Sequence, residues 1–288
     1  MNAVYKKELK AYFSNMTGYI AVAMILVMTG IFVKVVSFDG QYPNMEYALP
    51  TAAIILLLAV PIVTMRSFAE ERRQKTDQLL YSLPISTTQI VLGKYLAMLT
   101  VFAIPVGILC VYPLILTMYG TVNLLASYAA LLLFFLMIAA MTGVCMFMSS
   151  LTESQVIAAV LGSCVLIVCY FAQILTSVLP MTAIASFAAF TALVLVASLV
   201  VYYFVRNYWI SFCTAVVLEG GLLIAYVTNR TAFQGLFQKT VNAIAIFDIY
   251  NTSVSSQLFD LTAVVYYLSL AVLFTVLTIQ TVEKRRYS

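Results

Sequence analysis

The feature that most constrains this chain is a succession of long apolar runs with almost no charge. A helix needs about 20 apolar residues to cross a hydrocarbon core about 30 Å thick. Eight runs of about this length cover residues 17–36, 48–65, 90–118, 122–149, 155–178, 181–205, 208–228 and 260–282. Charged residues make up only 9% of the 288 positions, against about a quarter in soluble domains. We therefore predict an all-α, polytopic membrane protein with about eight transmembrane helices, while short breaks between residues 150 and 230 leave seven or nine open.

The composition also argues against several kinds of chemistry. The chain has no histidine, which removes Ser-His and Cys-His nucleophile pairs and most metal sites. The Gly93-Lys94 pair does not fit a phosphate-binding P-loop, because Thr88 stands where the first glycine belongs. A net charge of +4 is too small to indicate nucleic-acid binding. We predict no enzyme activity, no metal and no cofactor in this chain.

Basic residues predict the orientation in the membrane, because cytoplasmic loops carry an excess of Lys and Arg. With an even number of spans, one side holds Lys6, Lys7, Lys10, Arg66, Arg72, Arg73, Lys75, Lys94, Arg206, Lys284, Arg285 and Arg286. The other side holds only Lys34, Arg230 and Lys239. We predict a multi-pass protein of the cell membrane (plasma or bacterial inner membrane) with both termini in the cytoplasm.

Two amphipathic segments lie outside the predicted spans. Residues 1–15 place apolar side chains at helical spacing between lysines, which is typical of an interfacial helix on a membrane face. Its expected apolar positions are Tyr5, Leu9, Tyr12, Phe13 and Met16. Residues 229–259 show a similar period on the extracytoplasmic side, with Gln238 on the polar face.

A third segment, residues 66–84, is cytosolic and strongly charged. Ser67 and Glu70 form a capping box that predicts a helix start, and Pro84 predicts its end. Ser86 and Gln89 form a second box, which restarts the chain as the third span. A short cytosolic helix held between two rigid ends can transmit force.

Several of these motifs resemble one family, the membrane subunits of ABC exporters of the second type, and in particular their gliding-motility-associated permease branch. The likeness is carried by residues 5–9, 68–73, 79–80, 82–86, 89–94, 149–155, 277–278 and 283–286. It covers the first five spans and the last. Residues 181–228 look like a hairpin added to a core of six spans.

The resemblance implies the permease subunit of an ATP-driven exporter, and it makes residues 66–84 the coupling helix that docks on a separate ABC ATPase subunit. The residues expected at that interface are Ser67, Phe68, Glu70, Glu71, Arg72, Arg73, Asp77, Leu79 and Leu80. ATP and Mg would then bind the partner ATPase. The permease itself would form a homodimer or pair with a related permease in the lipid bilayer. A solvated charged loop is the plainer interpretation of the same residues.

Glu219 is the one carboxylate near the middle of a predicted span, beside Gly220 and Gly221. Such a residue either lies on a translocation pathway or closes a gap between packed helices. A proton-coupled secondary transporter using Glu219 is therefore one alternative function. A membrane scaffold without transport activity is the other.

Overall fold

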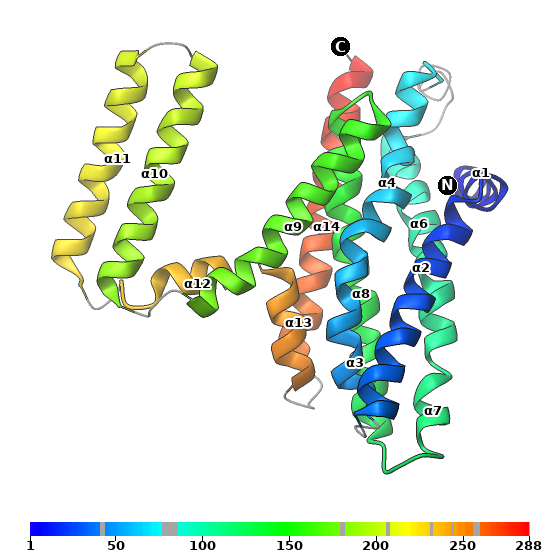
Figure 1. The fold of residues 1–288 in the computed structure, drawn as a ribbon. Coiled ribbons are helices and arrows are strands. Elements are labelled where there is room, and N and C mark those ends of the chain that lie inside the picture. The colour runs from blue at the N-terminus through cyan, green and yellow to red at the C-terminus, as the bar shows by residue number, and fades with distance from the viewer. Residues whose placement is uncertain are drawn as a thin grey trace. The chain divides into compact units, whose positions relative to one another are not determined.

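The computed structural model describes residues 1–40, 44–76, 86–178, 182–205, 208–230, 233–242, 245–255 and 260–287. Within these ranges every regular element is a helix, and no strand occurs (Figure 1). The elements are α1 (Asn2–Ser14), α2 (Thr17–Phe32), the π-helix η1 (Val33–Asp39), α3 (Met45–Ala52), the 3-10 helix η2 (Ala53–Ile55), α4 (Leu56–Arg73), α6 (Thr87–Leu109), α7 (Tyr112–Leu116), α8 (Leu124–Leu151), α9 (Gln155–Val178), α10 (Ala183–Val205), α11 (Tyr208–Thr228), α12 (Leu236–Asn242), α13 (Ile246–Ser255) and α14 (Leu261–Tyr287).

Six helical segments among the described residues are long and apolar enough to cross a membrane. They are Thr17–Asp39, Met45–Arg73, Thr87–Leu116, Leu124–Leu151, Gln155–Ala172 and Leu261–Arg286. The other two predicted runs form α10 and α11, whose described apolar stretches, Ala183–Leu195 and Ala215–Thr228, are shorter than a span. The all-helical, multi-pass prediction is confirmed, and the count of eight stays a prediction.

Residues Met1–Val168 and Ile249–Ser288 form one compact unit. Its central element is α8, which carries no charged residue and packs against α14, α4 and α6 (Figure 1). The backbones of α8 and α14 approach closely at Gly143, where an added Cβ atom would be in van der Waals contact with the Ala271 carbonyl oxygen, at 3.5 Å. Small residues at such points allow two membrane helices to approach each other.

The second span of this unit is one continuous helical rod built from α3, η2 and α4. Pro50 lies inside α3 and removes a backbone donor, and the helix tightens into the 3-10 turn η2 shortly after it. The rod then continues to Arg73 and so runs from one end of the unit to the other (Figure 1). We call the end formed by α1, the last turns of α4, α8 and α14 and the first three turns of α6 the basic end.

The structure corrects the predicted helix over residues 66–84. Ser67 does not begin a helix, because α4 enters this region already formed and runs from Leu56 to Arg73 without interruption. The end of α4 is set by Lys75, which has a φ of 56°. The Thr76 amide donates to the Glu71 carbonyl oxygen at 2.9 Å. This bond and the left-handed backbone conformation of Lys75 form a C-terminal cap on α4. Residues 77–85, with Pro84, lie outside the described residues.

The serine half of the predicted second capping box is confirmed. Ser86 is the N-cap of α6, and its hydroxyl oxygen accepts from the Gln89 amide at 3.4 Å. The hydroxyl therefore satisfies one of the free amides of the first turn.

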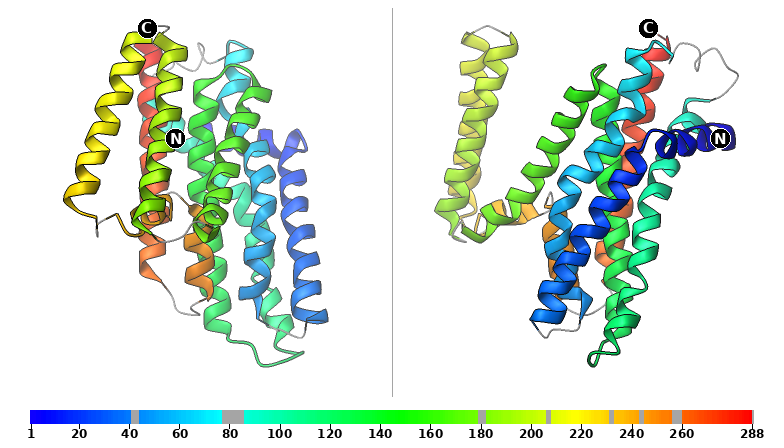
Figure 2. Two further views of the ribbon diagram at one scale, coloured as in Figure 1. Left: turned by 60° about the vertical axis from the view of Figure 1, so that its left-hand side comes forward. Right: turned by 45° about the vertical axis from the view of Figure 1, so that its right-hand side comes forward.

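The predicted helix at residues 1–15 is present as α1, which runs across the spans at the basic end (Figure 2, right). Its buried residues are Val4, Glu8 and Tyr12, of which only Tyr12 was predicted. The predicted Tyr5, Leu9 and Phe13 are half-buried, and Met16 is exposed. The buried face packs mainly against α6. The prediction did not include Glu8 because a carboxylate does not fit an apolar stripe.

Residues Cys169–Asp248 form the second compact unit. Within it, α10 packs against α11 and α12. Phe190 makes edge-to-face contacts with Phe233 and Phe237. The rings of Tyr226 and Phe187 are in contact at a tilt of 38°, with their centroids 4.8 Å apart. The predicted outer segment contains two short helices, α12 and α13, and Gln238 is buried instead of exposed.

Candidate functional site

The basic end contains a buried lysine that joins three helices. Lys94 lies on α6, two turns after its start, and its side chain is 1% exposed. Its Nζ is 2.9 Å from Glu8 Oε1 on α1 and 2.9 Å from Glu71 Oε2 on α4. The same nitrogen donates to the Ser67 carbonyl oxygen at 2.7 Å. An ammonium group has three donors, so all of them are used.

The charges of this cluster balance. Glu8 and Glu71 face the buried Lys94, and Glu71 also pairs with the exposed Lys7 at 3.1 Å. The ring of Phe68 adds a cation–π contact, with its centroid 5.2 Å from Lys94 Nζ. Removing one partner from such a buried network leaves an uncompensated charge, which is strongly destabilising. We call Glu8, Glu71 and Lys94 the charge clamp.

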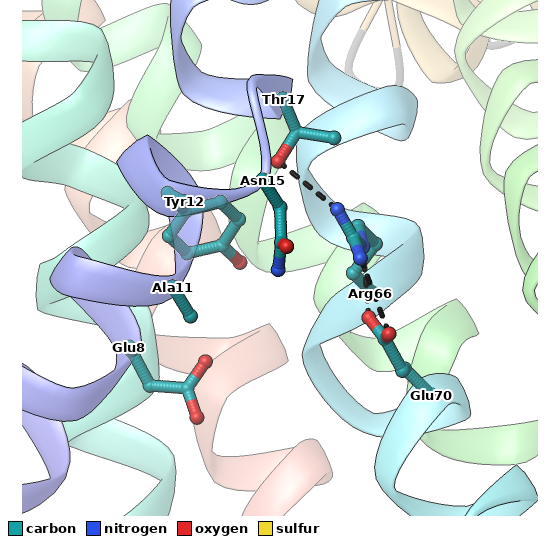
Figure 3. Close-up of a pocket in the computed structure, with 7 residues that line it drawn as sticks. All are labelled: Glu8, Ala11, Tyr12, Asn15, Thr17, Arg66 and Glu70. Carbon is teal, nitrogen blue, oxygen red and sulfur yellow. Dashed lines mark hydrogen bonds and ion pairs between the residues drawn. The ribbon is translucent and has the colours of Figure 1, made fainter.

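A second polar junction lies beside the clamp, between α1, the start of α2 and α4. Arg66 makes two hydrogen bonds to the Glu70 carboxylate, at 2.8 and 3.2 Å, and a third to the Thr17 hydroxyl at 3.3 Å (Figure 3). These residues line a small pocket of about 40 Å³, which is large enough to hold water. The pocket lining also includes Glu8, Ala11, Tyr12 and Asn15 (Figure 3).

Tyr12 fixes α1 to α4 from the wall of this pocket. Its hydroxyl donates to the Val63 carbonyl oxygen at 3.2 Å, and the residue is buried. Burial, followed by the negative charge of Glu8, raises the pKa of Tyr12 well above its ordinary value. The hydroxyl therefore stays protonated and remains a donor over the physiological range.

The other side of α4 is held by the end of α8. The Ser149 hydroxyl oxygen accepts from the Phe68 amide at 3.4 Å and donates to the Met65 carbonyl oxygen at 3.3 Å. Arg72 donates to the Thr152 carbonyl oxygen at 3.4 Å. Arg285 on α14 donates to the Leu151 carbonyl oxygen at 3.1 Å. The last turn of α4 is thus connected to α1, α6 and α8.

The structure divides the described members of the predicted interface into three groups: buried, ion-paired and exposed. Ser67, Phe68 and Arg72 are buried inside the unit, at 1%, 3% and 8% exposure. Glu71 is engaged in the charge clamp, and Glu70 is paired with Arg66. Of the described members only Arg73 is exposed, while Asp77, Leu79 and Leu80 lie outside the described residues. Phe68, which was expected at the interface, is therefore not on the surface of this unit.

Lys94 and Glu8 were not among the predicted site residues. One signal for Lys94 was present, since a lysine seven positions inside an otherwise apolar helix is costly unless it has a partner. A similar signal for Glu8 is its spacing of four residues from the buried Val4 and Tyr12.

Glu219 lies on α11, in the other unit. It shares an intermediate exposure with Ala215, Leu222 and Tyr226, which recur along one face of the helix. A Cβ atom added at either of the two glycines beside it would meet no heavy atom of another described element within 4 Å. No described neighbour therefore approaches these glycines closely, and a role of Glu219 in transport stays a prediction.

A profile described as "ABC-2 family transporter protein" matches residues 9–216. The chain belongs to the ABC-2 transporter family. A search of curated proteins and one of solved structures found no significant match. The match makes this protein a multi-pass permease subunit of an ABC transporter. Lys94 and Glu71 lie within the matched region of the ABC-2 permease, whereas Glu8 and Glu219 lie just outside it.

Proposed function

We propose that this ABC-2 permease is an ATP-driven exporter subunit of the gliding-motility branch, and that it receives work from a separate ATPase subunit at its basic end. The observation that carries the proposal is the charge clamp. Lys94 binds residues of α1 and α4 from its position on α6. A force applied to the last turn of α4 would therefore be shared by three helices.

Charge supports the assignment of the basic end to the cytosol. Lys6, Lys10, Arg73 and Lys75 are all exposed at this end. A positive surface beside a cytosolic helix end agrees with the positive-inside rule. It also suits reversible docking on an acidic surface of the ATPase, because complementary charge orients the two proteins during encounter.

The ATPase would bind ATP and Mg, and the permease would supply only the membrane path. Two permease chains, either identical or related, would form that path together. Few polar residues occur within the six spans, which favours an amphiphilic or hydrophobic cargo, or a mechanical role, over small ions. The docking residues proposed here are Arg73 and the exposed lysines of α1, with Asp77, Leu79 and Leu80 still proposed from the family resemblance.

Site-specific photo-crosslinking tests the proposal. A photoreactive residue replaces Arg73, and a matched one replaces Met118, which is 85% exposed beyond the end of α7 at the other end of the unit. In native membranes we expect capture of an ATPase subunit from position 73 and not from position 118. Capture of no ATPase at position 73, or equal capture at both positions, would contradict the proposal.

A further inference from the structure

Glu46 is a buried carboxylate at the far end of the rod from the charge clamp. It is the second residue of α3 and is 3% exposed. Neither carboxylate oxygen has a hydrogen-bond partner among the described residues. The Ser127 hydroxyl on α8 lies close enough to interact with the carboxylate, but its oxygen also has no hydrogen-bond partner among the described residues.

No cation compensates Glu46 from the described elements that pack on α3. These elements are α2, η1, η2 and α8. Neither α2, η2 nor α8 carries a charged residue, and the charged residues of η1, Lys34 and Asp39, are both exposed. Three other titratable side chains occur on these elements. They are Tyr19, which is exposed at the basic end, Tyr128, which donates to the Cys110 carbonyl oxygen, and Cys145.

The two ends of the rod therefore differ in how their carboxylates are accommodated. Glu71 has Lys94 and Lys7 within 3.1 Å, so its negative charge is balanced. Glu46 has only neutral neighbours, and an unpaired buried charge costs several kcal/mol even after relaxation. A neutral carboxyl group avoids this cost and gains an O–H donor, and the Ser127 hydroxyl oxygen, which has no partner of its own among the described residues, can accept from it.

We propose that Glu46 is a proton-binding site that controls the packing of α3 against α8. One proton binds one carboxylate oxygen, the charge changes from −1 to 0, and the new O–H group donates to Ser127. Loss of the proton places a bare charge between α3 and α8 and loosens that contact. This inference concerns the isolated subunit and does not depend on a partner ATPase.

The pH dependence of thermal unfolding tests the site in purified full-length protein. Because the folded state favours the neutral carboxyl, its stabilising effect is present at low pH and is lost as pH rises. We expect the Tm of the wild type to fall on going from mildly acidic to alkaline buffer. Glu46→Gln, which stays neutral, should remove part of that fall, so that its Tm advantage grows with pH. Parallel profiles of the two proteins would overturn the proposal.

Infrared spectroscopy gives a second readout that remains useful if Glu46→Gln does not fold. The wild type should show the carbonyl band of a protonated carboxyl group at neutral pH. Ser127→Ala should shift this band by removing its hydrogen bond, while Glu219→Gln, which changes the carboxylate on α11, should leave it in place. A wild-type spectrum without such a band, or a band that disappears in Glu219→Gln, would show that Glu46 does not hold the proton.

Discussion

Lys94 Nζ and Glu8 Oε1 are 2.9 Å apart, although the two residues are separated by 86 positions in the sequence. This ion pair is buried, and it fixes α1 to a membrane helix instead of leaving α1 free on the surface. Glu71 completes the contact from α4. The first helix of the chain is thus part of the same mechanical unit as the second and third spans.

Replacing Lys94 by methionine tests the clamp as a source of stability. Lys94→Met keeps the length of the side chain but leaves Glu8 and Glu71 without their buried cation. We expect a loss of about 3–5 kcal/mol in the free energy of unfolding. Thermal unfolding in detergent measures the loss, with the exposed Lys10→Met as the matched control, expected within about 0.5 kcal/mol of wild type.

A partial rescue separates charge balance from packing in the same experiment. Lys94→Met leaves two carboxylates beside one remaining cation, Lys7, so adding Glu8→Gln restores the charge balance. The double variant should therefore be more stable than Lys94→Met alone. If Lys94→Met were as stable as Lys10→Met, the clamp would have no energetic role.

The two glutamates of α4 should respond differently to charge reversal. Glu71→Lys places a third ammonium group beside Lys94 and Lys7, so we expect a protein that is poorly folded by size-exclusion chromatography. Glu70→Lys breaks a partly exposed pair with Arg66 and should cost only about 0.2–1 kcal/mol. Equal losses from the two variants would contradict the distinction drawn between the clamp and the neighbouring pocket.

Tyr12 predicts a pH effect in the alkaline range. The raised pKa of its hydroxyl means that the folded state retains the proton after an unfolded tyrosine, with a pKa of about 10, has lost it. Stability from this group is therefore present below about pH 10 and declines above it. Tyr12→Phe removes this decline and also the bond to Val63, at a cost of about 0.5–1.5 kcal/mol at neutral pH.

Chemical unfolding at neutral and alkaline pH measures both effects of Tyr12→Phe. The free energies of the wild type and the variant should converge as the pH rises. A constant difference between them would mean that the Tyr12 proton does not contribute.

Gly143 offers a test of the contact between α8 and α14. A methyl group added at Gly143 would be at ordinary van der Waals distance from the Ala271 backbone, so Gly143→Ala should change stability little. The side-chain atoms beyond Cβ in Gly143→Ile would overlap the α14 backbone. Overpacking of this kind costs about 1–3 kcal/mol. A Tm for Gly143→Ile equal to that of Gly143→Ala would argue against close helix packing here.

Six of the eight predicted spans recur in the structure, because hydrocarbon thickness sets helix length and composition. The sequence also predicted the cap at Ser86, which depends only on residues three positions apart. It failed at Ser67, where the local capping pattern is present but the preceding apolar helix continues through it. A helix that is already formed has no free amides at that point for a serine to cap.

The clamp could not be predicted from spacing. The pairs Lys94–Glu8 and Lys94–Glu71 connect three helices, and such contacts depend on how those helices are arranged in space. The charge of Glu70 and Glu71 indicated an exposed docking surface, whereas the structure directs both carboxylates toward cations of the same chain. The exposed part of the predicted interface is reduced to Arg73 among its described members.

The most direct test of the central claim is gentle purification of this permease from native membranes, followed by an assay of MgATP hydrolysis in the same fractions. We predict that an ATPase subunit co-purifies, and that Lys94→Met weakens its recovery more than Lys10→Met does. Uphill transport by the isolated chain in vesicles without any nucleotide-hydrolysing partner would contradict the account.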